Sequence, residues 1–224
     1  MAASPAPRSW WITSSGILLL LALVTSSLAW MEIAYPVLTL ANVSRHAGHV
    51  GWTYAHVVGG TFMLVFGTLN LYIGATRRLF RFHRQVGYLY LAGGAFGAVL
   101  ALIVSLATLH GKVVRPFAFD LTVVEDSGFG LAMLAIAWLV CAAMGWRAAR
   151  NRRIDNHRDW MIRSYVLAWS FVICRLLNKI PAMDVVTNLG GGAGFIWMSW
   201  LVPLGITELV LQWKAGGPLP ALRR

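Results

Sequence analysis

Residues 127–146 read SGFGLAMLAIAWLVCAAMGW and carry no charged side chain over 20 positions. An α-helix needs about 20 apolar residues to cross the hydrocarbon core of a bilayer, so the length fits one passage. The next twelve residues, 147–158, contain five arginines. An apolar run that ends in a basic run predicts a membrane-spanning helix with its basic end at the cytoplasmic surface.

Five further segments have a similar apolar composition, and the whole chain shows no barrel-like alternation. Because lipid cannot satisfy backbone hydrogen bonds, we predict an all-α, polytopic transmembrane helix bundle formed by residues 1–224 as one domain. Its spans are expected at about residues 10–30, 51–74, 86–109, 127–147, 159–180 and 193–213. The first segment also resembles a signal peptide, and its cleavage would leave five spans.

The composition also excludes some classes of function. The chain is 58% hydrophobic and only 12% charged, with a net charge of +11. The basic residues lie between apolar segments, where they are expected to face anionic lipid headgroups rather than nucleic acid. No nucleotide-binding loop or hydrolase motif is present, and the two cysteines form no CxxC pair.

The arginines set the expected orientation. Nine lie in the two loops 75–85 and 147–158, and the opposite loops hold most of the acidic residues. The positive-inside rule therefore predicts that both loops and both termini are cytoplasmic. These nine residues are Arg77, Arg78, Arg81, Arg84, Arg147, Arg150, Arg152, Arg153 and Arg158.

Small residues recur along the third predicted span. Gly93, Gly97, Ala101 and Ser105 are four residues apart, and so share one helix face. Such a face allows a neighbouring helix, or a flat cofactor, to approach closely. The glycines of the second predicted span offer a weaker version of this pattern.

Two spans contain charges that require a partner or a function. Arg163 and Glu208 are expected at the same depth near the cytoplasmic ends of the fifth and sixth spans, so we predict that they form an ion pair. Arg175 is expected near the outer end of the fifth span. Both arginines are interpreted as structurally neutralised, with proton or anion handling as the alternative.

His83 and His157 are expected to open the third and fifth spans on the cytoplasmic side. Two imidazoles at one depth on facing helices are the arrangement that holds a b-type haem, and Arg84 and Arg158 could contact its propionates. The alternative is that both histidines precede their helices as interfacial side chains, and that the arginines bind lipid phosphate.

The remaining histidines are expected on the outer side. His46 and His49 are one helical turn apart, and His56 and His110 could approach them. Imidazoles in this number would suit zinc or copper, although no thiolate and no HExxH sequence accompanies them. The alternative is that they are solvated loop histidines without a metal.

Two motifs carry a family resemblance: FHRQVGYLY at residues 82–90 and HRDWMIRSY at residues 157–165, followed by Arg175. Over about residues 50–180 the chain resembles the bacterial predicted membrane proteins of domain of unknown function 2306. Asn70 stands where that family usually has glutamine. A looser likeness to b561-type membrane cytochromes rests on the span number and on the histidines of the third and fifth spans.

Three functions fit these observations. The first is a redox component of the bacterial inner membrane that holds one haem b between His83 and His157 and exchanges electrons with a quinone. The second is a non-enzymatic accessory or assembly subunit of a larger membrane complex. The third is a small transporter, with Arg163, Arg175 and Glu208 lining a polar path.

Overall fold

A computed structural model describes residues 50–110, 127–177 and 193–215 of the chain. Over these ranges all regular elements are helices, and there is no strand. The chain divides between Gly97 and Ala98 into two compact units, which are described in turn. The predicted first span, about residues 10–30, lies outside the described residues.

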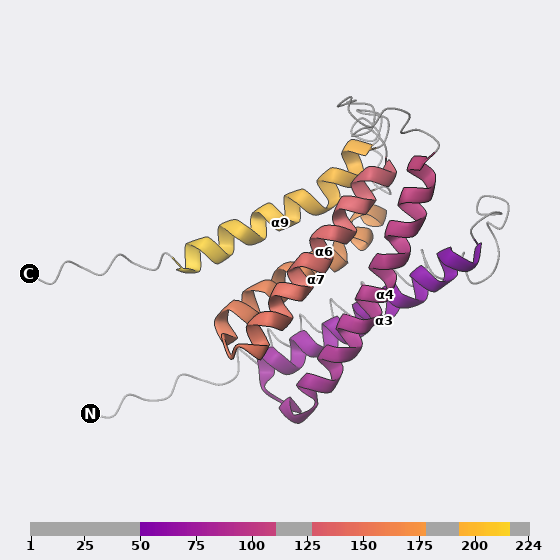
Figure 1. Cartoon of the computed structure of the whole chain (residues 1–224). Coiled ribbons are helices and arrows are strands. Elements are labelled where there is room, and N and C mark those ends of the chain that lie inside the picture. The colour runs from indigo at the N-terminus through magenta and orange to yellow at the C-terminus, as the bar shows by residue number, and fades with distance from the viewer. Residues whose placement is uncertain (1–49, 111–126, 178–192, 216–224) are drawn as a thin grey trace, which may run out of the picture. The chain divides into compact units, whose positions relative to one another are not determined.

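The elements, labelled in Figure 1, follow the predicted spans closely. The fifth span is the exception, because its helix begins at Ile154 rather than at residue 159, so His157 lies inside the helix and does not precede it. The elements are α3 (Val50–Thr76), η3 (Phe80–Phe82), α4 (His83–His110), α6 (Ser127–Arg150), α7 (Ile154–Leu177) and α9 (Ala193–Ala215).

Four stretches of the described chain are long and apolar enough to cross a membrane: Tyr54–Thr76, Phe80–Leu106, Gly128–Arg150 and Gly194–Trp213. Helix α7 is not among them, although its 24 residues are long enough. Its apolar run is interrupted by Asp155, Arg158, Asp159, Arg163 and Arg175. Over its described residues the chain is therefore almost entirely helical, with four candidate spans.

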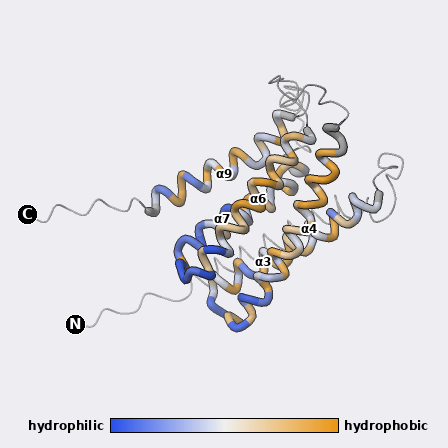
Figure 2. The backbone as a smooth tube through the Cα atoms, in the orientation of Figure 1, coloured by the Kyte–Doolittle hydropathy of each residue, from blue (hydrophilic) through white to orange (hydrophobic). Residues whose placement is uncertain are grey.

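Large apolar side chains are exposed along these helices. Figure 2 shows hydrophobic residues along the lengths of the helices, and hydrophilic residues where α6 ends and α7 begins. Exposed apolar surface of this extent suits a lipid environment better than water. The most exposed examples are Trp213, Leu209, Ile154 and Leu106.

In the first unit, α3 and α4 pack through glycines. A Cβ added at Gly59 would lie 2.9 Å from the backbone nitrogen of Gly97 and 3.0 Å from the carbonyl oxygen of Gly93. A Cβ at Gly93 would lie 2.8 Å from Cβ of Phe62. The two backbones are therefore nearly in contact, which only small residues permit. Gly60 is different, since a Cβ there would meet nothing within 4 Å.

In the second unit, α7 packs against both α6 and α9. The most buried side chains of α7 are Ser164, Leu167, Ser170 and Val172. The Ser164 hydroxyl donates a hydrogen bond to the Met161 carbonyl at 2.9 Å, which satisfies this polar group inside the unit. Small hydroxyl residues at helix interfaces are typical of membrane bundles.

The turn between α6 and α7 is a Schellman motif. The N–H of Arg153 donates to the carbonyl of Ala148 at 2.9 Å, and the N–H of Arg152 donates to that of Ala149 at 3.0 Å. Arg152 has a φ of 57°, the left-handed conformation that glycine usually supplies at this position. An arginine is thus held where its backbone is strained.

Candidate functional site

His157 is fixed against α6. Its Nδ1 lies 2.9 Å from the carbonyl oxygen of Gly145. A carbonyl only accepts, so Nδ1 carries the hydrogen and the lone pair of the neutral ring is on Nε2. This is the usual second-sphere arrangement of metal-binding histidines, whose other ring nitrogen donates to a backbone carbonyl.

The helices approach closely at this bond. A Cβ added at Gly145 would lie 2.7 Å from the Sδ of Met161 and 3.4 Å from Cβ of Trp160. Met161 follows His157 by one helical turn, so both contact the same glycine from one face of α7. Gly145 therefore leaves room for Met161 and Trp160 beside the His157 bond.

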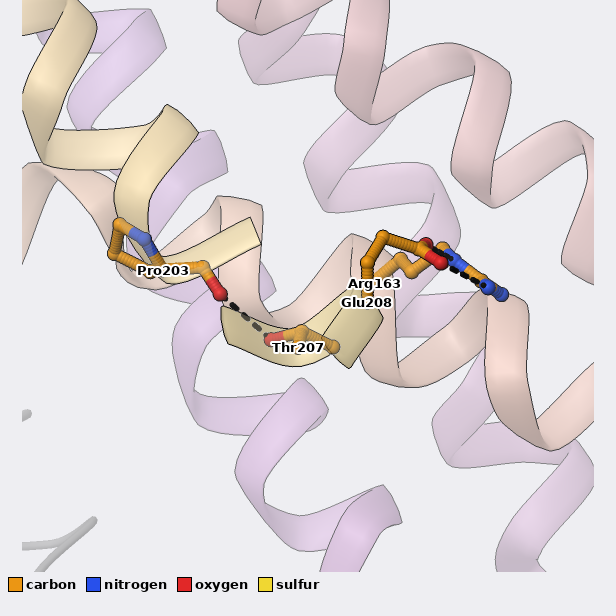
Figure 3. A network of polar contacts seen from close by, with 4 residues as sticks. All are labelled: Arg163, Pro203, Thr207 and Glu208. Atoms are coloured by element: carbon orange, nitrogen blue, oxygen red, sulfur yellow. Dashed lines mark hydrogen bonds and ion pairs between the residues drawn. The ribbon is translucent and has the colours of Figure 1, made fainter. Parts of the chain in front are cut away.

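The structure brings Arg163 and Glu208 together, as Figure 3 shows. The Arg163 Nε donates to Oε1 of Glu208, and its second nitrogen donates to Oε2 at 3.1 Å. The Arg163 guanidinium also lies 4.8 Å from the centroid of the Trp160 ring. A two-bond arginine–carboxylate contact of this kind fixes both side chains and joins α7 to α9.

Glu208 follows a proline in α9. Pro203 lies inside this helix and has no N–H to donate to the preceding turn. Thr207, the residue before Glu208, donates a hydrogen bond from its hydroxyl to the Pro203 carbonyl at 2.8 Å (Figure 3). The helix continues through the proline and presents Glu208 to Arg163.

Arg158, a predicted haem or phosphate contact, is engaged on its own helix. Its side chain lies 3.5 Å from Oδ1 of Asp159 and 4.0 Å from Oδ1 of Asp155. The Arg158 and Asp155 side chains are largely exposed, so these pairs contribute little to stability. They do place two carboxylates at the start of α7, next to the arginine-rich turn.

In the first unit, His83 is the first residue of α4. Its ring stacks on Phe80 with centroids 5.1 Å apart and planes 6° apart. A Cβ added at Gly74 would lie 3.6 Å from its Cε1, so this glycine leaves space for the imidazole. Arg84, the predicted propionate contact, lies 5.6 Å from the centroid of the Tyr88 ring.

Two further candidates, Asn70 and His56, lie in α3. The Asn70 Nδ2 is 3.2 Å from the position of a Cβ on Gly87, and its buried Oδ1 has no hydrogen-bond partner among the described residues. The Nδ1 of His56 lies 2.8 Å from the carbonyl oxygen of Gly97. His56 is thus tied to α4 across the glycine contact.

Several predictions lie outside these observations. His83 belongs to the first unit and His157 to the second, so their pairing stays a prediction. His46, His49 and the side chains of His110 and Arg175 lie outside the described residues. In the described part of the chain no three His, Cys, Asp or Glu side chains group as metal ligands, and the outer zinc or copper site stays a prediction.

The sequence did not reveal the two glycine carbonyls that fix the histidines. The sequence indicates Gly145 only as part of an apolar segment and Gly97 only as part of a helix face of small residues. A histidine and a glycine at facing positions of adjacent spans would have been the signal. Only the register between the helices shows that they meet.

Long apolar helices joined by arginine-rich turns define a helical membrane protein. The chain matches the sequence model of the family described as predicted membrane protein (DUF2306) over residues 53–211, and it belongs to that family. The match extends beyond the predicted limit of about residue 180 and includes Glu208. Comparison with curated proteins and with solved structures gave no match.

Proposed function

We propose that this protein is a membrane redox component that binds one b-type haem, with His157 and His83 as its axial ligands. The observation that carries the proposal is the His157–Gly145 bond, which places the lone pair of the ring on Nε2. Imidazoles bind haem iron through this nitrogen, and the carbonyl bond increases their basicity. The assignment of His83 rests on its place in the sequence.

The surroundings of each histidine are compatible with this role. His157 lies beside the end of α6 and the turn that follows it, which carry Arg150, Arg152 and Arg153, and His83 is followed by Arg84. Guanidinium groups suit propionates because they form paired hydrogen bonds to a carboxylate. The chemistry that a bound haem supplies is transfer of one electron at a time, and a quinone is the expected redox partner.

The same proposal includes the topology. Six spans would place both arginine-rich turns and both termini on the cytoplasmic side of the bacterial inner membrane. The four candidate spans and the excess of arginine at the α3–α4 and α6–α7 turns support this arrangement. Helix α7 would then cross beside α6 and α9, with Arg163 neutralised by Glu208.

Absorption spectroscopy tests the proposal. The full chain, expressed with ample haem and purified in mild detergent, should show a Soret band and about one haem per chain, as expected for one pair of axial ligands. His157→Ala and His83→Ala should each lose the low-spin spectrum. His56→Ala is the matched control, because it removes a similar histidine–carbonyl bond and should keep the haem.

A folded, monodisperse and colourless preparation would contradict the haem proposal. The two alternatives would then be distinguished in the same sample. A partner that co-purifies in fixed stoichiometry would indicate an accessory or assembly subunit. Thermal stabilisation by one compound in a panel of small solutes would indicate a transporter.

A further inference from the structure

The turn between α3 and α4 carries positive charge without compensation. Arg77, Arg78, Arg81 and Arg84 are all exposed. No aspartate or glutamate occurs anywhere from residue 50 to residue 110, so neither helix of this pair offers a carboxylate. By contrast, the start of α7 contains Asp155 and Asp159 beside Arg158. The four arginines at the α3–α4 turn therefore have no acidic side chain in either helix to pair with, and their charge is available to an anion from outside this helix pair.

Large apolar side chains are exposed among these arginines. Leu79 is 57% exposed and Phe80 is 58% exposed, and η3 has no buried residue. The Arg81 guanidinium lies 4.6 Å from the centroid of the Phe82 ring. In this segment the exposed arginines alternate along the sequence with exposed aromatic and aliphatic side chains, so that cationic and apolar groups lie next to each other. Such surfaces fit the boundary between lipid headgroups and acyl chains.

The backbone holds these side chains in an unfavourable conformation. Arg77 has a φ of 54° and Leu79 a φ of 55°, both in the left-handed region. Two hydrogen bonds fix the turn: Arg78 N–H to Thr76 Oγ1 at 3.2 Å, and Phe82 N–H to the Leu79 carbonyl at 2.8 Å. Glycine would relieve this strain at either position. The chain has a charged and an apolar side chain there instead.

We propose that residues 77–81 are a binding site for the headgroup of an anionic phospholipid. Arg77, Arg78 and Arg81 pair with its phosphate groups, because a guanidinium matches phosphate oxygens with two parallel hydrogen bonds. Leu79 and Phe80 enter the region just below the headgroups. The site goes beyond the proposed redox function and does not depend on haem.

Native mass spectrometry of the full chain in detergent tests the site directly. The protein is titrated with phosphatidylglycerol and, separately, with phosphatidylcholine. Wild type should bind the anionic lipid more tightly, and Arg78→Gln and Arg81→Gln should each weaken that binding about fivefold, the effect of one basic residue near a charged membrane surface. Phosphatidylcholine binding should not change.

Arg77→Gly separates a ligand role from a structural one. Arg77 has a left-handed backbone conformation that glycine adopts without strain, so the substitution should raise the unfolding temperature in phosphatidylcholine bicelles. The affinity for phosphatidylglycerol should fall, because the guanidinium is lost. Arg152→Gly is the matched control, since it relieves the same strain in the α6–α7 turn. It should also raise the unfolding temperature, with a clearly smaller loss of lipid affinity.

Three results would overturn the proposal. One is unchanged phosphatidylglycerol binding in the Arg78→Gln and Arg81→Gln variants. Another is an equal loss in Arg77→Gly and Arg152→Gly, which would mean that affinity follows only the net charge. The third is competition by inorganic phosphate or glycerol phosphate as strong as that of the lipid, which would identify a site for a soluble phosphate.

Discussion

The α3–α4 and α6–α7 helix pairs use the same contact in different places. In each pair, the Nδ1 of a histidine bonds to a glycine carbonyl of the other helix: His56 to Gly97 at 2.8 Å, and His157 to Gly145 at 2.9 Å. His157 lies in the first turn of α7, beside the arginines, whereas His56 lies near the start of α3, far from its arginine-rich turn.

The two pairs also differ in charge. The α6–α7 pair has carboxylates beside its arginines, and α7 forms a further ion pair with α9. The α3–α4 pair contains no acidic residue and relies on contact between glycine backbones. Both pairs thus share the histidine bond, but α7 has charged partners near its start and on α9, whereas α3 and α4 have their close backbone contact away from their turn. This difference predicts which substitutions damage which pair.

The largest effect is expected at the ion pair of the second unit. Glu208→Gln would leave Arg163, whose side chain is only 16% exposed, without its carboxylate. We expect a loss of about 2–3 kcal/mol, below the roughly 3–5 kcal/mol of a fully buried pair because Glu208 is partly exposed. Reversible denaturation by SDS in mixed micelles measures the unfolding free energy.

Exchange of the two charges sharpens this measurement. Arg163→Glu combined with Glu208→Arg should recover most of what each single change loses, because the attraction survives the exchange. Asp155→Asn is the control, since its exposed pair with Arg158 should contribute under about 1 kcal/mol. A double variant no more stable than the worse single variant would show that the pair is not what stabilises α9 against α7.

The next effect is expected at the glycine contact of the first unit. Gly59→Ala places a Cβ 2.9 Å from a backbone atom of α4, which cannot rotate away. We expect a loss of about 1–3 kcal/mol, the usual range for overpacking. Gly60→Ala is a closely matched control, because its Cβ would enter open space and should be neutral or gain up to about 1 kcal/mol in helix propensity.

The same denaturation experiment measures both alanine variants. Equal stabilities of Gly59→Ala and Gly60→Ala would contradict the close approach of α3 and α4. That result would also remove the contrast between the backbone contact of α3 with α4 and the charged contacts of α7. A Gly59→Leu variant should be more severe than Gly59→Ala if the backbone contact limits the space.

The sequence was sufficient to predict where most of the helices lie along the chain, but not most of the contacts between them. Apolar length located α3, α4, α6 and α9 within a few residues, because one helical passage requires a fixed number of apolar side chains. The start of α7 was placed too late, since residues 154–158 are too polar to count as a span, yet they fit an exposed helical turn. Helix formation and membrane crossing are separate properties.

Part of the candidate site could also be predicted from the sequence. The expected partners Arg163 and Glu208 lie together because two charges at one depth have few other ways to be neutralised. The carbonyl partners of His56 and His157 were not predicted, since every residue has a carbonyl and only helix register selects one. The strained Arg77 and Arg152 were missed for a similar reason: turn conformation depends on how two helices are joined.

The smallest effect is expected at the two histidine bonds. His56→Phe and His157→Phe keep an aromatic ring and remove one hydrogen bond, which should cost about 0.5–1.5 kcal/mol in each case. The losses stay small because each glycine carbonyl lies within a helix that provides it with another donor. Equal losses would show that the two bonds serve one structural purpose in both helix pairs.

The absorption spectrum then distinguishes the two histidines beyond stability. His157→Phe should lose haem and His56→Phe should keep it, although both lose a similar bond to a glycine carbonyl. If both variants keep a normal spectrum, His157 is a structural residue like His56, and the two helix pairs differ only in charge. A loss of haem in His157→Phe alone would mean that His157, which lies beside the arginines, binds haem in addition to its bond with the glycine carbonyl.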